Sequence, residues 1–283
     1  MQKRVAAIHD ISCLGRCSLT VALPVLSAGG IETSVIPTAI LSTHTGGFPG
    51  FTFRDLSSDI LPIARHWKSL NIRFDAMYTG YLASFQQLEI VSELLDMFSA
   101  EDNLLFVDPV MGDNGKFYTS FYPEFAGGMT KLCSKADVII PNLTEAALLL
   151  GEEYRNGPYT EDYIKYLLQS LAELGPKKVV VTGVYFDDDT LGAAAYDRDT
   201  EEIAYVLNEK IPGSYHGTGD IFGSTLLAAL LNGFSLYDST EIASKYTSDS
   251  IRCSYAGATD RRFGVSFEYS LGELAGVLRP SGL

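Results

Sequence analysis

Gly217-Thr218-Gly219-Asp220 is followed at once by an apolar run of small and aliphatic residues that ends at Leu231. The run is typical of a buried helix, so the glycines are expected at its N-terminus, where backbone N–H groups lack partners and the helix dipole is positive. Glycine also lets the backbone approach a bulky anion closely. The stretch therefore predicts an anion site beside a carboxylate, which suits phosphoryl transfer. The alternative is an ordinary loop in which Asp220 only complements the helix dipole.

Length and composition place the chain among globular proteins with a sizeable core. It has 283 residues, of which 46% are hydrophobic and 20% are charged, values usual for one α/β domain spanning residues 1–283. The net charge of −14 argues against a nucleic-acid partner, which needs a basic face. Every apolar stretch is too short to cross a bilayer, so no membrane partner is expected.

The cysteines are few and irregularly spaced. Cys13, Cys17, Cys133 and Cys253 are accompanied by only four histidines, a pattern that does not suit a structural zinc site. Because no signal peptide is recognised, free thiols and a cytoplasmic location are expected. Cys13 and Cys17 are expected to pack as small residues, since nothing in the sequence supplies a base for a nucleophilic thiol.

Strand-like apolar segments alternate with segments of helical period. Strands are predicted at residues 4–8, 33–37, 76–79, 103–107, 136–140 and 178–181, with a hairpin at 193–197 and 202–206. Helices are predicted at residues 17–28, 55–70, 85–98 and 160–174, in a short segment up to Leu150, after Gly217, after Tyr237 and near Leu271. The alternation predicts an α/β fold with a mainly parallel sheet, and the continuous apolar strands indicate burial on both faces.

Ligands of such sheets bind beyond the carboxyl ends of the strands. The polar residues at these ends are therefore the candidates for a site: His9-Asp10, Thr79-Gly80-Tyr81, Asp108, Asn142 and Thr182-Gly183. The sequence contains no G-x-x-x-x-G-K-[ST] motif and no G-x-G-x-x-G after the first strand. These absences argue against a P-loop NTPase and a dinucleotide-dependent dehydrogenase.

Five segments, in order along nearly the whole chain, carry a family resemblance. They are Leu41-Ser42-Thr43-His44-Thr45-Gly46, Thr79-Gly80-Tyr81-Leu82, Val107-Asp108-Pro109-Val110-Met111-Gly112-Asp113, Ile139-Ile140-Pro141-Asn142-Leu143-Thr144-Glu145 and Gly217-Thr218-Gly219-Asp220. With them the chain resembles the ribokinase superfamily and, most closely, its vitamin B6 kinase branch. The resemblance implies a ribokinase-like three-layer sandwich, with a mainly parallel central sheet flanked by helices.

The resemblance also implies an activity, the ATP-dependent phosphorylation of the 5′-hydroxymethyl group of pyridoxal, pyridoxamine or pyridoxine. Mg²⁺ is expected as a cofactor, and a monovalent cation (K⁺ or Na⁺) and a homodimer are implied, with residues 46–54 as a β-rich flap that contributes to the dimer. Two alternatives remain open. One is a hydroxymethylpyrimidine kinase of thiamine synthesis, and the other is a protein that binds a B6 vitamer without catalysis.

The glycine loop and its acid receive the catalytic roles. Asp220 is predicted to be the general base that accepts the proton of the attacking alcohol. Gly217, Thr218 and Gly219 are predicted to present backbone amides to the transferring phosphoryl group.

Four residues are predicted to serve ATP: Asp108, Asn142, Glu145 and Thr182. Asp108 is expected to act through Mg²⁺, with Glu145 as a second metal residue, because carboxylate oxygens suit this hard cation; the alternative for Asp108 is a turn former. Asn142 and Glu145 also fit an N-cap and capping box for the helix ending at Leu150, and both readings can hold. Asp113 either helps a monovalent cation or makes a turn.

Five residues are predicted to contact the vitamer: Asp10, Ser12, Thr45, Gly46 and Tyr81. Asp10 stands where the family often has a serine, and Ser12 is a candidate substitute. A carboxylate at this place predicts acceptance of the aminomethyl vitamer, since a charge-assisted pair is stronger than a neutral hydrogen bond.

Flexible loops supply lid candidates at residues 47–50 and 112–118, since a closing loop excludes water. Tyr118 is a further lid or substrate candidate. His44 is expected either to stack beside the vitamer or to be hydrogen-bonded within a packed loop. Tyr81 packs on the vitamer ring or is an ordinary rim aromatic.

Overall fold

The computed structural model describes residues 2–100, 103–118 and 121–279. Within these residues the main sheet has nine strands in the order β11-β10-β9-β8-β5-β4-β1-β2-β3, and β6 pairs only with β7. The strands are β1 (Arg4–Leu14), β2 (Glu32–Thr43), β3 (Phe53–Asp55), β4 (Ala76–Thr79), β5 (Leu104–Val107), β6 (Gly112–Asp113), β7 (Lys116–Phe117), β8 (Val138–Ile139), β9 (Lys178–Val184), β10 (Thr190–Asp197) and β11 (Glu202–Glu209). The run from β2 to β9 is parallel, whereas β3, β10 and β11 add antiparallel edges.

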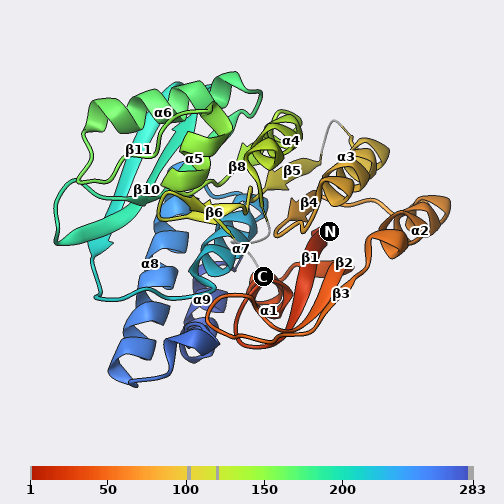
Figure 1. Ribbon diagram of the computed structural model, residues 1–283, viewed down its shortest axis with the longest axis horizontal. Helices are drawn as coiled ribbons and strands as arrows, with labels where there is room; N and C mark the ends of the chain where they lie inside the picture. The colour runs from red at the N-terminus through yellow and green to blue at the C-terminus, as the bar shows by residue number, and fades with distance from the viewer. Residues whose placement is uncertain (1, 101–102, 119–120, 280–283) are drawn as a thin grey trace.

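Helices cover both faces of the sheet (Figure 1). One face carries α2 (Ser57–Ser69), α3 (Phe85–Phe98), α4 (Pro123–Cys133), α5 (Leu143–Leu150) and α6 (Glu161–Glu173). The other face carries α1 (Leu19–Ala28), α7 (Thr218–Leu231), α8 (Leu236–Ala256) and α9 (Leu271–Val277). The predicted three-layer sandwich is confirmed.

Consecutive strand residues enter opposite cores because side chains alternate along a strand. In β5, Leu105 and Val107 join the core under α2 to α6, whereas Phe106 joins the core under α7 and α8. In β9, Val180 likewise faces the second core. This two-sided burial explains why the strands are continuously apolar in sequence.

The strand and helix predictions hold with shifted ends. β1 and β2 run well past their predicted limits, to Leu14 and Thr43, and form with β3 an arm that extends beyond the end of β4. The predictions contain no counterpart of α4, of the β6–β7 hairpin or of the 3-10 turns Arg261–Phe263 and Phe267–Ser270. The hairpin turn is Asn114-Gly115, with φ of 52° and 74°, the backbone that an Asn-Gly turn favours.

Candidate active site

The anion loop has the predicted position at the N-terminus of α7. Gly217 is the N-cap residue with a φ of 77°, a left-handed conformation that favours glycine. A Cβ at this position would lie 2.1 Å from the Arg16 carbonyl oxygen, so the β1–α1 loop passes directly against it. Beside Gly219, by contrast, no described atom outside its chain neighbours and the backbone of α7 lies within 4 Å of the Cβ position. Gly217 therefore anchors the loop, and Gly219 leaves space for an anion. Figure 1 shows α7 between α8 and α1.

Asp220 is held by one of its two carboxylate oxygens. Oδ2 accepts the backbone N–H of Ser18 at 2.8 Å and the Cys17 thiol at 3.4 Å. Among the described residues nothing donates to Oδ1, which leaves this oxygen for a substrate hydroxyl. Burial, together with the nearby charge of Asp10, raises the pKa of Asp220 to about 6. A carboxylate with a pKa close to neutral is suited to act as a general base.

Asp108 lies at the carboxyl end of β5 and is buried. Burial and the charges of Glu145 and Asp220 raise its pKa well above the usual range. Its carboxylate accepts no hydrogen bond from any described residue, and none of the ion pairs in the described ranges includes it. The three carboxylates thus lie near one another without a cationic side chain, an arrangement that a bound cation would favour.

Glu145 and Asn142 form the capping box of α5 that the sequence offered as one reading. The Asn142 side chain accepts from the Glu145 N–H, and Glu145 Oε2 accepts from the Asn142 N–H, each at 2.9 Å. Glu145 Oε1 accepts the Met111 N–H at 3.0 Å, and Asn142 Nδ2 donates to the Gly112 carbonyl at 2.8 Å. Burial raises the pKa of Glu145 to about 8. The pair therefore ties the segment after Asp108 to the start of α5.

The predicted nucleotide residue Thr182 is half-buried in β9 and pairs with Asn142 through an isolated parallel bridge. Asp113 is exposed, and its carboxylate accepts from the N–H and side-chain amide of Asn114. Of the two readings for Asp113, the turn is therefore present in the structure.

Asp10 is buried within β1, just past the part of the strand that pairs with β4, and it shares Ser18 with Asp220. Its carboxylate accepts the Ser12 hydroxyl at 3.1 Å and the Ser18 hydroxyl at 2.5 Å. Burial raises its pKa, and the two hydroxyl donors act in the opposite direction. Asp10 and Ser12 are thus direct partners and not independent candidates.

The predicted vitamer loop follows β2. His44 is buried, Thr45 is exposed and Gly46 is half-buried. The Gly46 N–H donates to His44 Nδ1 at 3.1 Å, and His44 Nε2 lies 2.5 Å from the Arg262 carbonyl oxygen. Since Nδ1 accepts, Nε2 carries the proton that it donates to Arg262. Of the two alternatives predicted for His44, the structure therefore shows the one in which the ring is hydrogen-bonded within a packed loop.

The remaining aromatic and lid candidates lie in two places, after β4 and β5 and in the loop after β2. Tyr81 is half-buried and its ring lies 5.5 Å from that of Phe121. Tyr118 follows the β6–β7 hairpin, and desolvation, together with the charges of Glu145, Asp113 and Asp108, raises its pKa. The lid candidate 112–118 is a paired hairpin, and residues 47–50 pack through Phe48 against Phe263.

Sequence reasoning missed Ser18, Arg262 and His216, which complete the site. Ser18 supplies a hydroxyl to Asp10 and an amide to Asp220; its φ of 52° is unusual for a residue with a side chain. Arg262 lies far along the chain, so only the fold brings its carbonyl to His44. His216 directly precedes Gly217, and this adjacency was the available signal.

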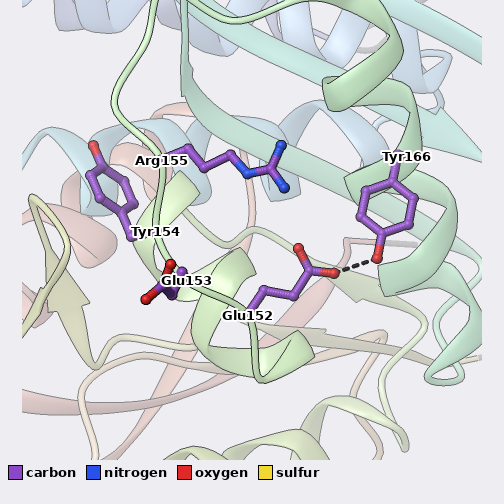
Figure 2. A pocket seen from close by; sticks show the side chains of 5 residues that line it. All are labelled: Glu152, Glu153, Tyr154, Arg155 and Tyr166. Atoms are coloured by element: carbon purple, nitrogen blue, oxygen red, sulfur yellow. Dashed lines mark hydrogen bonds between the residues drawn. The ribbon is translucent and has the colours of Figure 1, made fainter.

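A pocket of about 430 Å³ lies away from these residues, around the segment that joins α5 to α6. Figure 2 shows its lining, with Tyr166 donating its hydroxyl to Glu152. The lining residues are Glu152, Glu153, Tyr154, Arg155 and Tyr166, and it contains none of the predicted site residues.

The donors present fit Mg²⁺ when nucleotide oxygens complete its coordination. Within the described ranges, no group of three or more His, Cys, Asp and Glu side chains could hold a metal alone. Mg²⁺ commonly takes one or two carboxylates together with phosphate oxygens and water. The buried Asp108 carboxylate, free of hydrogen bonds from the described residues, meets that requirement.

A glycine loop at a helix N-terminus with a half-buried carboxylate in the first turn, and a buried carboxylate at a neighbouring strand end, are the features expected of a small-molecule kinase of the ribokinase type. Residues 25–262 match the family model described as phosphomethylpyrimidine kinase, and the chain belongs to this family.

Curated and solved relatives point to the vitamin B6 branch, as the sequence motifs predicted. A pyridoxal kinase of Dictyostelium discoideum is 29% identical over 259 residues, which cover 86% of this chain and 82% of the relative. A Bacteroides thetaiotaomicron protein provisionally assigned as a phosphomethylpyrimidine kinase, crystallised with pyridoxal, is 39% identical with a TM-score of 0.93, covering 100% of this chain and 98% of that one. The pyridoxal kinase of Lactobacillus plantarum is 31% identical with a TM-score of 0.88, covering 98% of each chain.

Proposed function

We propose that this protein transfers the γ-phosphoryl group of ATP to the 5′-hydroxymethyl group of a B6 vitamer, as a kinase of pyridoxal, pyridoxamine or pyridoxine. The observation that carries the proposal is the arrangement of Asp220, with Oδ2 engaged by Ser18 and Cys17 and Oδ1 left for the substrate. The relatives named pyridoxal kinase and the relative crystallised with pyridoxal support the choice of substrate.

In this reaction Asp220 Oδ1 takes the proton of the hydroxymethyl group as its oxygen attacks the γ-phosphorus. The amides of Gly217, Thr218 and Gly219 bind the phosphoryl oxygens as negative charge builds there, and the open space beside Gly219 admits them. The bond to the bridging oxygen breaks, and ADP leaves with that electron pair. The loops around the site would exclude water during the reaction.

Asp108 would hold Mg²⁺, which supplies charge neutralisation for the phosphates when bound. Glu145 would contribute its charge or act through water, because each of its oxygens already accepts a backbone N–H. The backbone at Asn142 and Thr182 would lie against the bound nucleotide. A monovalent cation near Asp113 belongs to the same proposal.

On the vitamer side, Thr45 and Gly46 would contact the pyridine ring, with Tyr81 packing at its rim. Asp10 and Ser12 would contact the substituent next to the transferred group. These five residues lie toward the carboxyl ends of the parallel strands or just after them, and the assignments rest on that position.

We further propose that the chain acts as one kinase domain and forms a homodimer in the cytoplasm. Four apolar side chains of the β1–β2–β3 arm and of the loop before β3 are exposed, namely Leu14, Ile40, Phe51 and Phe53, and exposed apolar surface of this kind is available to a partner subunit. The four free thiols agree with a reducing compartment. Within the described residues, none of the helices has the length and hydropathy needed to cross a membrane.

The test is ADP release by the purified protein with Mg²⁺-ATP and, separately, pyridoxal, pyridoxamine, pyridoxine and hydroxymethylpyrimidine. Turnover with a B6 vitamer that is lost in Asp220→Asn is the expected result. Turnover with the pyrimidine alone would keep the mechanism and move the substrate to thiamine synthesis. Tight vitamer binding without ADP release would favour a non-catalytic binding protein and overturn the proposal.

A further inference from the structure

Two loops of the active site meet at a pair of histidines. The imidazole rings of His44 and His216 lie with centroids 4.8 Å apart and planes inclined by 43°. His44 belongs to the loop that carries Thr45 and Gly46, and His216 directly precedes the anion loop at Gly217. The contact therefore joins the predicted vitamer loop to the predicted phosphate loop.

The vitamer loop is fitted closely to His216. A Cβ at Gly46 would lie 2.5 Å from His216 Cε1 and 2.9 Å from Nδ1. The φ of Gly46 lies outside the left-handed region, so its backbone accepts alanine and only the space for a side chain is lacking. The imidazole of His216 thus occupies the place where any side chain at Gly46 would go.

His44 is fixed from the opposite side. Its Nδ1 accepts the Gly46 N–H, and its Nε2 donates to the Arg262 carbonyl. Phe48 meets the His44 ring edge-on at 5.1 Å, and the Arg262 guanidinium lies 5.6 Å from the centre of the Phe48 ring. The loop is therefore held on one side by the segment around Arg262, and His216 is the contact that orients it toward the anion loop.

The anion loop has anchors that do not depend on His216. Gly217 lies against the Arg16 carbonyl, and Thr218 Oγ1 donates to the Tyr215 carbonyl at 3.3 Å. Loss of the His216 ring would thus remove the contact of the vitamer loop with the phosphate loop, while the phosphate loop keeps its shape.

We propose that His216 is a positioning residue that sets the vitamer loop against the anion loop, so that the hydroxymethyl group is placed toward Asp220. This inference rests on the proposed function, because it assigns the bound vitamer to the loop at Gly46. Its physical basis is preorganisation, since a binding loop that is not held in place must be ordered when the ligand binds, which costs affinity.

The test compares His216→Ala, Gly46→Ala and the double variant with the unmodified protein. His216→Ala is expected to raise KM for the vitamer about tenfold, the cost of ordering the loop on binding, and to change KM for ATP less than about twofold. Gly46→Ala is expected to raise KM for the vitamer as well, because its methyl group meets the imidazole. In the double variant the methyl enters the vacated space, so the combined effect is smaller than the product of the two single effects.

His66→Ala is the matched control, since His66 is exposed on α2 and lies outside the site. His216→Phe retains a ring and is expected to restore most of the vitamer KM. Unchanged vitamer KM in His216→Ala, or effects that multiply in the double variant, would overturn the inference. If the unmodified protein gives no turnover, the proposed function fails on its own. Calorimetric vitamer binding by the same variants then decides whether the coupling holds.

Discussion

The vitamer side and the phosphate side of the site differ in how their polar groups are satisfied. On the vitamer side, Asp10 accepts two serine hydroxyls and His44 uses both ring nitrogens. On the phosphate side, Asp108 has no hydrogen-bond donor among the described residues, and its carboxylate lies near those of Glu145 and Asp220. Like charges that are buried together raise one another's pKa. The polar groups on the vitamer side thus have partners within the protein, whereas the phosphate side is suited to bind a cation and phosphates.

The strongest test of this contrast is Asp220→Asn, which keeps the shape and removes the base. Turnover should fall about 10²–10⁴-fold, the range for a general base, while Mg²⁺-ATP binding measured by calorimetry is retained. Asp59→Asn is a matched control, because Asp59 is also an acid in the first turn of a helix. If both substitutions had equally small effects on turnover, Asp220 would only complement the helix dipole and would not be the general base.

Asp108→Asn should have the next largest effect, on Mg²⁺ dependence. The amide lacks the charge that holds the cation, so we expect the Mg²⁺ concentration for half-maximal turnover to rise at least about tenfold. Asp113→Asn should leave that concentration unchanged, because the Asp113 carboxylate already closes the Asn114 turn. A Mg²⁺ titration of ADP release measures both, and an unchanged midpoint in Asp108→Asn would contradict the assignment.

The same contrast predicts how stability depends on pH. The pKa of Asp220 rises to about 6 and that of Glu145 to about 8 in the folded state. The folded state therefore binds protons more tightly than the unfolded chain, and the stability from this binding is lost as pH rises between about 4 and 8. Thermal unfolding without nucleotide should show a Tm that falls across this window, with a weaker fall in Asp220→Asn. A Tm that rises through the window would contradict the burial of these carboxylates.

Local sequence predicted the phosphate side better than the vitamer side. Asp108, Asn142 and Asp220 follow or open regular elements, so a strand end or a helix start identifies each one. The contacts of His44 with Arg262 and of Asp220 with Ser18 join residues 218 and 202 positions apart. No periodicity in the sequence reports such pairs, because they depend on how the loops meet after the sheet has formed.

The predicted ends of β1 and β2 were wrong for a similar reason. β1 and β2 pair beyond the point where β4 stops, so the arm to Leu14 and Thr43 gains its strand structure from pairing and not from burial of an apolar run. The β6–β7 hairpin, by contrast, was predictable in principle. Its Asn114-Gly115 pair is a strong turn signal, which the reading of residues 112–118 as a flexible lid passed over.

A smaller effect is expected on the vitamer side from Asp10→Ser. If Asp10 meets an aminomethyl group, losing its charge should lower the ratio of pyridoxamine to pyridoxal turnover by up to about tenfold, the value of one charge-assisted hydrogen bond. Asp10→Asn is the isosteric companion, since it keeps the volume between Ser12 and Ser18. The ratio of kcat/KM for the two vitamers is the measurement. A ratio that stays constant in both variants would remove Asp10 from vitamer selection.

The smallest effect is expected from Cys17, where the two sides meet. Its half-buried thiol donates to Asp220 Oδ2, and this hydrogen bond lowers the pKa of Asp220 against the rise caused by burial. Cys17→Ala should therefore move the acid limb of the kcat/KM profile upward from about pH 6, by less than about one unit, since a single hydrogen bond contributes about 1 kcal/mol. Cys17→Ser keeps a donor and should leave the limb near its original place. Cys253→Ala, which removes a half-buried thiol from α8, controls for loss of a cysteine as such. An acid limb that is the same in Cys17→Ala and the unmodified protein would mean that Ser18 alone sets the state of Asp220, and that the thiol only fills space between the two sides.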